Sequence, residues 1–289
     1  ARFKHTPYGG AENYLARIMY AMKEKGISFQ LFSTNWVDEN AKKITAPKLL
    51  PSFLRILVFA YFVCKQKNKD EILFSLERLP CADVYRAGDG VHKGWLDVRI
   101  KSGESRLKIF LNPLQFTYLW LEKRTFANVK KIIANSNFVK NDIINYYGVD
   151  PDKIDVIYNG VPKNNHDKTH SKEGICSEFD IPKDKKIILF VGSGFSRKGG
   201  LEFLKILSFL KRDDYTAIMV GKEKKISFYR DFAEKNSLNV LFVGARKDVE
   251  RFYAAADIFL FPTRYEPFSN VCLEAMAGGC AVVTTAQND

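Results

Sequence analysis

The chain has 289 residues, 46% of them hydrophobic and 27% charged, which is the composition of a globular protein and excludes a disordered one. This length is enough for two domains of ordinary size. The formal net charge of +12 has several explanations: an anionic membrane face, a phosphorylated acceptor, nucleic acid or simply a soluble basic protein. No basic helix with interleaved aromatic residues follows a known nucleic-acid docking pattern, so we expect no nucleic-acid partner.

Hydropathy and cysteine content indicate the cellular compartment in which the protein works. No apolar run reaches the ~20 residues that span a bilayer, and the longest candidate, 53–64, is interrupted by Arg55. We expect no cleavable signal peptide, because the first residues lack an apolar segment. The five cysteines are scattered and form no CxxC or Cys/His cluster, which predicts neither a disulfide framework nor a zinc site. A reducing cytoplasm is the simplest setting.

The first half of the chain alternates between helices and short strands. Gly9 and Gly10 form a turn before the first helix, the long helical stretch 104–128 is interrupted at Pro113, and Ser136 caps a helix that Gly148 ends. The expected helices are 11–25, 52–67, 104–128 and 137–147, and the expected strands are 29–33, 71–75, 83–87, 131–134 and 154–157.

A polar linker from 159 to about 173 separates this half from a second series of strands and helices. The strands of the second half are expected at 187–191, 216–220, 240–243, 258–261 and 281–285. Repeated βα units on both sides of one linker predict an α/β protein with two Rossmann-like parallel-sheet domains, 1–160 and 161–289. In such sheets ligands bind at the carboxyl ends of the strands, which we expect to face a cleft between the domains.

A glycine-rich loop follows the first strand of the second half. Gly192 and Gly194 let the backbone approach a ligand, and a helix expected from about Gly200 directs its N-terminal dipole there. Arg197 and Lys198 lie where they could reach a diphosphate. The alternative is a solvated charged loop.

A second candidate site follows the strand 258–261. A helix expected from Asn270, with Leu273, Met276 and Ala277 on its inner face and Gly278-Gly279 as its end, offers free N–H groups to an anion. Glu266 and Glu274 bracket this position, and carboxylates accept well from sugar hydroxyls. An anion site flanked by such acceptors suits a nucleotide-sugar, although two Glu at this spacing also occur on ordinary capped surface helices.

The segment 264–279 resembles the E-x7-E motif of retaining GT-B glycosyltransferases of the GT4 family, in its two Glu and in the surrounding Pro-Phe-Ser-Asn-Val-x-Leu-Glu-Ala-Met-Ala-x-Gly. This resemblance implies that Arg197 and Lys198 clamp the diphosphate, that Glu274 binds the ribose and that Glu266 binds a donor-sugar hydroxyl. It also places Arg246 beside the nucleobase. Independently of the resemblance, Asp248 is expected to cap the next helix, because Asp is a preferred N-cap residue. Phe268, Ser269, Asn270 and Val271 would line the sugar and diphosphate, and Gly9 and Gly10 would let the first helix face the β-phosphate.

The resemblance implies a hexosyltransferase that needs no cofactor beyond its donor substrate, a nucleoside diphosphate sugar, expected to be a UDP-sugar such as UDP-glucose. We also expect no metal, because the only D-x-D motif, Asp150-Pro151-Asp152, lies in a turn after Gly148. By likeness to lipopolysaccharide core glucosyltransferases, the acceptor would be a lipopolysaccharide core or another glycan or glycolipid. The enzyme would then be cytoplasmic and peripheral on the inner face of the cytoplasmic membrane. The family pattern also includes a strand before Gly9 and helices after 289, so we expect the full protein to extend beyond both ends.

The acceptor side departs from the family pattern. Where those glucosyltransferases have an Asp after the Gly-Gly and a His in the long helix, this chain has Tyr14 and Thr117. His92, on a Gly-rich loop near Asp89, is the candidate that could orient an acceptor hydroxyl or take its proton. A hydrogen-bonded loop histidine is the alternative.

Three other functions remain open. They are a catalytically inactive nucleotide-sugar-binding module, a sugar phosphorylase with lysine-bound pyridoxal phosphate, and a nucleic-acid binder that would explain the charge alone.

Overall fold

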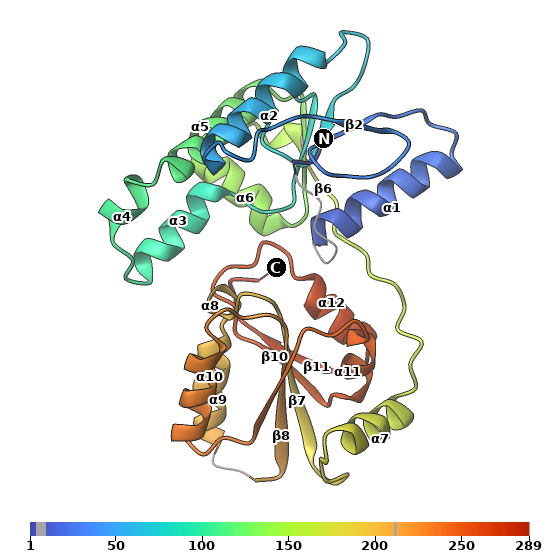
Figure 1. The fold of residues 1–289 in the computed structure, drawn as a ribbon, viewed down its shortest axis with the longest axis vertical. Coiled ribbons are helices and arrows are strands. Elements are labelled where there is room, and N and C mark those ends of the chain that lie inside the picture. The colour runs from blue at the N-terminus through green and yellow to red at the C-terminus, as the bar shows by residue number, and fades with distance from the viewer. Residues whose placement is uncertain (4–9, 211–212, 289) are drawn as a thin grey trace. The chain divides into compact units, whose positions relative to one another are not determined.

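The computed structural model describes residues 1–3, 10–210 and 213–288. The chain divides into two compact units, Ala1–Tyr158 and Asn159–Asp289. Each unit is built on a parallel sheet with helices packed against it (Figure 1). The division lies just before the domain boundary that the sequence suggested between 160 and 161.

The first unit contains a four-stranded parallel sheet in the order β3-β4-β5-β6 and a small parallel pair, β1-β2. The pair was predicted only in part, because its second strand has the hydrophilic sequence Ala-Lys-Lys. The strands are β1 (Leu31–Ser33), β2 (Ala41–Lys43), β3 (Phe74–Ser75), β4 (Val84–Ala87), β5 (Lys131–Ala134) and β6 (Ile154–Val156), and the helices are α1 (Gly10–Glu24), α2 (Ser52–Gln66), α3 (His92–Lys101), α4 (Arg106–Phe110), α5 (Pro113–Asn128) and α6 (Asn137–Tyr147).

Local signals set several helix ends in this unit. The Ser136 hydroxyl accepts a hydrogen bond from the backbone N–H of Val139 at 3.1 Å, and α6 ends at Gly148, whose φ of 63° is the left-handed conformation that glycine adopts without strain. Pro113 restarts the interrupted helix as α5, with Asn112 as its cap. The predictions for these ends are confirmed.

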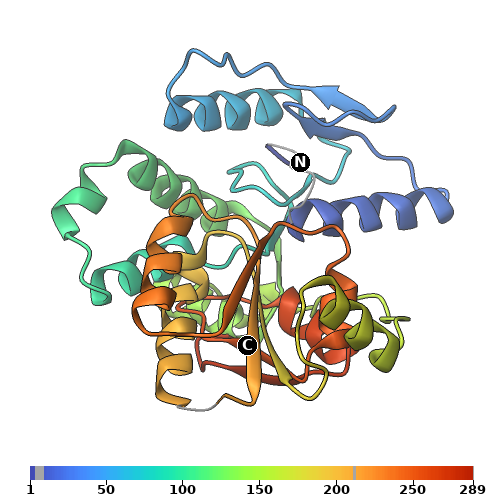
Figure 2. The ribbon, with the colours of Figure 1, turned by 60° about the horizontal axis from the view of Figure 1, so that its bottom comes forward.

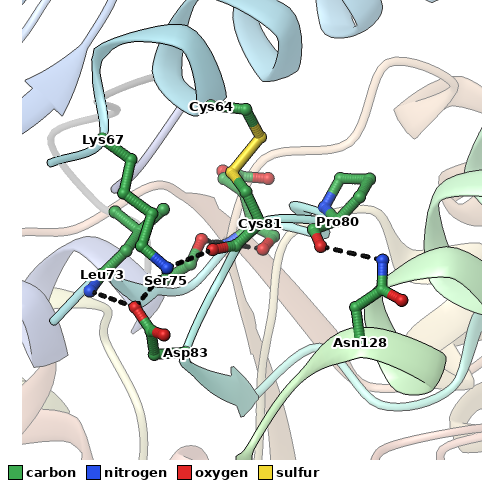
Figure 3. The surroundings of a disulfide bond; sticks show 9 residues. Cys64, Lys67, Leu73, Ser75, Pro80, Cys81, Asp83 and Asn128 are labelled. Carbon is green, nitrogen blue, oxygen red and sulfur yellow. Dashed lines mark hydrogen bonds and ion pairs between the residues drawn. A yellow bond between two sulfur atoms is a disulfide. The ribbon is translucent and has the colours of Figure 1, made fainter. Parts of the chain in front are cut away.

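A disulfide joins Cys64, near the end of α2, to Cys81, in the segment between β3 and β4 (Figure 3). The prediction of no disulfide was wrong, because the two cysteines are 17 residues apart in the sequence and only the packing of α2 brings them together. The ammonium group of Lys67 lies beside the bond, where it donates to the Cys81 carbonyl at 2.9 Å and pairs with Asp83 at 2.5 Å. The other three cysteines are buried thiols of the second unit.

The second unit contains a five-stranded parallel sheet in the order β11-β10-β7-β8-β9. Both faces are covered, with α9 and α10 on one side and α7, α11 and α12 on the other (Figures 1 and 2), which explains why every residue of β8 is buried. The strands are β7 (Lys186–Val191), β8 (Tyr215–Val220), β9 (Val240–Gly244), β10 (Ile258–Phe261) and β11 (Ala281–Thr284), and the helices are α7 (Lys168–Glu178), α8 (Phe195–Lys198), α9 (Gly200–Leu210), α10 (Ile226–Lys235), α11 (Val249–Ala255) and α12 (Asn270–Ala277).

The strand order creates a switch point between β7 and β10. From β7 the chain moves outward through β8 to β9, then crosses back to place β10 on the other side of β7. The loops that follow β7 and β10 therefore leave the sheet side by side in opposite directions, which is where doubly wound sheets bind ligands. Upstream, the expected linker is shorter than predicted, because Asp167 caps α7 and the helix begins at Lys168.

Candidate active site

The turn after β7 brings two cations to the switch point. Gly194 adopts a φ of 71°, and its backbone N–H donates to the carbonyl of Lys222 at 2.9 Å. Gly192 bonds in the same way to Val220. The chain then forms the short helix α8, which carries Arg197 and Lys198, so these two residues lie on a helix and not in the loop that the sequence suggested.

This turn is locked to the loop that follows β10. The carbonyl of Arg197 accepts from the backbone N–H of Arg264 at 3.2 Å and from the hydroxyl of Thr263 at 3.3 Å. Gly199 permits the approach, because a Cβ added there would lie 1.8 Å from the carbonyl oxygen of Pro262. The two cations are thereby held against the loop that contains Glu266.

Glu266 is the shared counter-ion of the two cations. Its carboxylate contacts the ammonium group of Lys198 and lies 3.3 Å from Nη1 of Arg197, which also donates to the carbonyl of Tyr265 at 3.2 Å. Glu266 is 8% exposed, and its backbone N–H is bonded to Gln287. Burial lowers the pKa of Lys198, and the neighbouring carboxylate of Glu266 opposes that effect.

The helix α12 begins as predicted, but a different face of it is buried. The Ser269 hydroxyl caps it by accepting from the N–H of Cys272 at 3.3 Å. Cys272 and Ala275 face the core, whereas Met276 is 59% exposed, so the predicted inner face was wrong. The physical reason is close packing on α11, which small side chains allow: a Cβ at Gly278 would lie 2.7 Å from that of Tyr253.

Glu274 and Asn270 are held by neighbours within the second unit. The hydroxyl of Tyr253, which is 1% exposed, donates to Oε2 of Glu274 at 3.1 Å. Burial and the adjacent Glu274 raise the pKa of that tyrosine. The side-chain carbonyl of Asn270 accepts from Asn159 at 2.9 Å. The structure thus brings Arg197, Lys198 and Glu266 into contact, while Glu274 lies eight residues further along on α12, oriented by α11. The side chains of Phe268 and Val271 are partly buried in the same segment.

Arg246 belongs to an ion-pair cluster. Its guanidinium forms two bonds of 2.9 Å with the carboxylate of Asp248 and pairs with Glu178 at 2.9 Å. Asp248 also accepts from Arg251 at 3.0 Å. Asp248 occupies the N-cap position of α11, but its side chain makes no cap hydrogen bond, so the predicted cap was wrong. The reason is that its carboxylate accepts hydrogen bonds from the guanidinium groups of Arg246 and Arg251 instead. The bond from Arg246 lowers the pKa of Asp248.

A cavity of about 800 Å³ lies in the second unit at the carboxyl ends of β7, β8 and β9. Gly194, Gly221 and Gly244 form its backbone walls, and Arg246 follows directly after the lining residue Ala245. Its polar edge is formed by Lys222, Glu223, Lys224 and Arg230. Glu223 accepts from the backbone N–H of Phe195 at 2.7 Å, which fixes the start of α8.

His92 is the first residue of α3 and does not lie within a loop. Its ring is 5.1 Å from that of Tyr118, centroid to centroid. Its Nε2 atom is buried and receives no hydrogen bond of good geometry among residues 1–3, 10–210 and 213–288, although the side chain of Gln115 lies close to the imidazole and partly opposes the lowering of its pKa. Burial, reinforced by the positive charge of Arg78, lowers the pKa of His92 to about 4, so the imidazole is neutral at physiological pH.

The remaining candidates of the first unit lie near the start of α1 and on α5. Gly9 lies outside the described residues, and Gly10 begins α1. Tyr14 stacks under the guanidinium of Arg86, at 3.5 Å from the ring centroid. Thr117 is buried and donates to the carbonyl of Pro113 at 2.9 Å, so its hydroxyl is used within α5.

Sequence reasoning missed a buried polar group around Glu122. This residue is 0% exposed and bonds to Arg78, Tyr147 and the backbone at the start of α3. One signal was available: Glu122 lies four residues from both Tyr118 and Phe126 and therefore shares a face of the helix with two aromatic residues. An acidic residue on such a face requires buried partners, but the sequence does not say which.

No group of three or more His, Cys, Asp or Glu side chains that could hold a metal ion occurs in the described part of the chain. The residues in contact at the switch point are two cations, Arg197 and Lys198, and the carboxylate of Glu266.

Comparison with known proteins places this fold and site in a family. The model of Glycosyltransferase Family 4 matches residues 8–164, and that of Glycosyl transferases group 1 matches residues 171–289. The chain belongs to the retaining GT4 glycosyltransferases, and its two parallel sheets are those of the GT-B fold.

Individual relatives agree with this assignment. The lipopolysaccharide glucosyltransferase WaaG of Escherichia coli is 27% identical over 98% of this chain and 79% of its own length. A crystal structure of WaaG, a glycosyltransferase involved in lipopolysaccharide biosynthesis, superimposes with a TM-score of 0.82 at 23% identity, covering 99% of this chain and 80% of the other. The structure of Anabaena Alr3699/HepE in complex with UDP-glucose gives 0.64 at 18% identity, covering 99% and 80%.

Proposed function

We propose that this glycosyltransferase moves a hexose from a UDP-sugar to a lipopolysaccharide core or another glycan or glycolipid acceptor. The observation that carries the proposal is the contact of Arg197 and Lys198 with one carboxylate, Glu266, at the switch point of the second sheet. Two cations and a hydroxyl acceptor at the carboxyl ends of the strands suit a sugar diphosphate. The second unit would then bind the donor and the first unit the acceptor.

The chemistry depends on the leaving group. As the bond between the sugar and the β-phosphate breaks, negative charge grows on the nucleoside diphosphate. Arg197 and Lys198 are fixed in position by the Gly199 turn, so they would stabilise that charge without rearranging. Glu266 would give up part of its contact with the cations and accept from a hydroxyl of the donor sugar. No metal ion takes part in this proposal.

The proposal also assigns the nucleoside to the second unit. We assign the base to the cavity beside Gly244 and Ala245, whose glycine walls admit a flat ring, and the ribose to Glu274, which Tyr253 orients. Arg246 would not contact the base through its guanidinium, which is bound to Asp248 and Glu178; it would instead help to hold the backbone at the Ala245 side of the cavity in place. Because the similar Anabaena fold was solved with UDP-glucose, that sugar nucleotide is the first donor to test.

For the acceptor we propose His92. A neutral imidazole at the start of α3 can orient a hydroxyl, and the low pKa of His92 keeps it neutral throughout the physiological range. Because that low pKa also makes the imidazole a weak base, orientation is the role that we assign to it. Tyr14 and Thr117, which replace the Asp and His of the similar glucosyltransferases, are engaged with Arg86 and Pro113.

We also propose that the enzyme works at the cytoplasmic face of an anionic membrane. The Cys64–Cys81 bond counts against a reducing compartment, so this proposal rests on the family likeness and on the surface described next. None of the described helices has the length and hydropathy to cross a bilayer. The exposed face of α4 and α5, here called the α4–α5 patch, combines apolar and basic side chains, as interfacial helices do. Its apolar members are Leu107, Phe110, Leu111, Phe116 and Trp120, and its basic members are Arg106, Lys108, Lys123 and Arg124.

Two measurements test the donor proposal. Dialysed protein should show a thermal shift with UDP, and UDP release from UDP-glucose should follow when core-truncated lipopolysaccharide is added. Absence of any shift with UDP or GDP would contradict the proposal. Binding without either transfer or hydrolysis would instead identify an inactive nucleotide-sugar-binding module.

A further inference from the structure

A buried carboxylate in the first unit collects hydrogen bonds from three other segments. Oε1 of Glu122 accepts from the backbone N–H of His92 at 2.8 Å and from Nε of Arg78 at 2.9 Å. Oε2 accepts from the hydroxyl of Tyr147 at 2.7 Å and from the backbone N–H of Lys93 at 3.3 Å. Glu122 on α5 thus ties together the start of α3, the end of α6 and the segment after β3.

The start of α3 depends on this distant carboxylate. Val91 occupies the N-cap position and makes no side-chain cap hydrogen bond, since valine has no acceptor to offer. The first N–H groups of a helix have no partner within it, and a negative charge there is favoured by the helix dipole. Glu122 supplies the acceptors for His92 and Lys93 from a different helix, so it fixes the backbone from which the His92 ring projects.

Arg78 provides the positive charge that the buried carboxylate of Glu122 requires, and it also bonds to the loop that contains Gly90. It pairs with Glu122 and donates through Nη2 to the carbonyl of Gly90 at 3.2 Å. Buried carboxylates need such a partner, because an unpaired charge in the interior is strongly unfavourable. Arg78 also places positive charge near His92, which lowers the pKa of that imidazole.

We infer that Glu122 is a positioning residue for the acceptor side of the reaction: through the N–H groups of His92 and Lys93 it sets the place of the His92 imidazole. This inference rests on the proposed role of His92. It differs from a merely stabilising ion pair in one respect. Weakening the contacts of Glu122 should reduce the turnover of enzyme that remains fully folded.

Adjacent tyrosines on α6 provide a matched pair of variants. The Tyr147 hydroxyl donates to Glu122, whereas the Tyr146 hydroxyl donates to Asp97 in the middle of α3 at 2.8 Å. Tyr147→Phe and Tyr146→Phe each remove one hydroxyl that contacts a carboxylate, but only the first affects Glu122. Glu122→Gln is the stronger variant, since an amide keeps the shape and loses one acceptor oxygen and the charge.

The first measurement is amide hydrogen exchange of the segment 91–95, which needs no substrate. We expect Glu122→Gln and, to a smaller extent, Tyr147→Phe to speed exchange there, and Tyr146→Phe to leave it as in the wild type. Unchanged exchange in Glu122→Gln would overturn the inference. Should Glu122→Gln fail to fold, unchanged exchange in Tyr147→Phe would overturn it instead.

The second measurement is transfer from UDP-glucose to core-truncated lipopolysaccharide, below the melting temperature of every variant. We expect kcat to fall roughly 10- to 100-fold in Glu122→Gln. We expect a fall of about threefold in Tyr147→Phe and less than about twofold in Tyr146→Phe, with the KM for UDP-glucose unchanged in all three. A lower melting temperature with wild-type kcat would leave Glu122 a stabilising residue and overturn the inference. A wild type that transfers no sugar counts against the proposed function alone, and the exchange data still decide the inference.

Discussion

Lys198 and Glu266 are in direct contact although they lie 68 residues apart and follow different strands of the second sheet. Lys198 is the last residue of α8, which follows β7, and Glu266 lies in the loop after β10; Arg197 approaches the same carboxylate oxygen at 3.3 Å. In the proposed function the two cations would form a prearranged site, because neither would have to move toward the other when a diphosphate binds. Glu266 and phosphate would then compete for the same positive charge.

Removing either cation should slow sugar transfer much more than it weakens folding. For Lys198→Ala or Arg197→Ala we expect kcat with UDP-glucose to fall on the order of 10²- to 10³-fold, because the charge on the departing diphosphate loses a fixed partner. Steady-state UDP release measures the effect. Lys205→Ala, an exposed lysine of α9, is the control and should behave as the wild type. Equal rates in Lys198→Ala and Lys205→Ala would contradict the clamp.

Substituting Glu266 should affect nucleotide binding and catalysis in opposite directions. In Glu266→Gln the cations lose their counter-ion, so we expect UDP, which lacks the donor hexose that Glu266 would contact, to bind more tightly than to the wild type. Transfer from UDP-glucose should fall, because the acceptor for the sugar hydroxyl is weakened. Isothermal titration with UDP and a kinetic assay separate the two effects. Weaker binding of UDP by this variant would show that Glu266 does not compete with phosphate.

His92 should make folding of the first unit sensitive to acid. A free histidine has a pKa of about 6.5, and in the folded chain that pKa is lowered to about 4. Between these values the unfolded state binds the proton and the folded state does not, so stability is complete above about pH 6.5 and decreases as the pH falls toward 4. At about 1.4 kcal/mol per pKa unit, the loss reaches up to about 3 kcal/mol.

Melting curves between pH 4 and 7 test this dependence, with His92→Gln as the comparison. The variant should lose less stability on acidification than the wild type, because glutamine does not titrate. His166→Gln, which changes a histidine on an exposed segment, is the control and should retain the wild-type slope. Parallel curves for the wild type and His92→Gln would contradict the assignment of the low pKa.

The disulfide should stabilise the first unit. Closing a loop between residues 17 apart is expected to contribute about 3 kcal/mol, chiefly by restricting the unfolded chain. Reduction should therefore lower the melting temperature by roughly 6 to 12 °C. The Cys64→Ser/Cys81→Ser variant should melt like the reduced wild type and should not respond to the reductant. Five titratable thiols in the denatured, unreduced protein, where the structure leaves three cysteines unpaired, would show that the bond does not form.

What the sequence predicted correctly depended on nearby residues. Ser136 and Gly148 specify the ends of α6 through groups within a few residues, and the 264–279 motif carried the family. Glu122 and the Cys64–Cys81 bond could not be predicted in this way, because their partners lie on other elements. The prediction of the buried face of α12 was wrong for a related reason. The residues that α12 buries, Cys272 and Ala275, are determined by its packing against Tyr253 of α11, which the sequence of α12 does not reveal.

The α4–α5 patch should bind anionic vesicles through both charge and apolar contact. Leu107 on α4 is 68% exposed, and Leu111, which directly follows α4, is 71% exposed; Lys108 lies on α4 and Arg124 on α5. Near an anionic surface each basic residue contributes about 1 kcal/mol, so Lys108→Gln/Arg124→Gln should weaken binding to phosphatidylglycerol vesicles roughly 30-fold. Co-sedimentation at two salt concentrations measures this change, and high salt should reduce the difference because exposed charges are screened.

The apolar contribution to vesicle binding is tested separately. Leu107→Ser/Leu111→Ser should weaken binding at both salt concentrations, because the burial of apolar surface is not screened by ions. Phe209→Ser is the control: Phe209 lies on α9 and is 79% exposed, so the change removes an apolar side chain of similar exposure from the second unit. If Phe209→Ser and the leucine variant reduce binding equally, the membrane contact is not specific to this patch. If neither does and only the charge variant matters, the patch lies above the lipid headgroups without inserting.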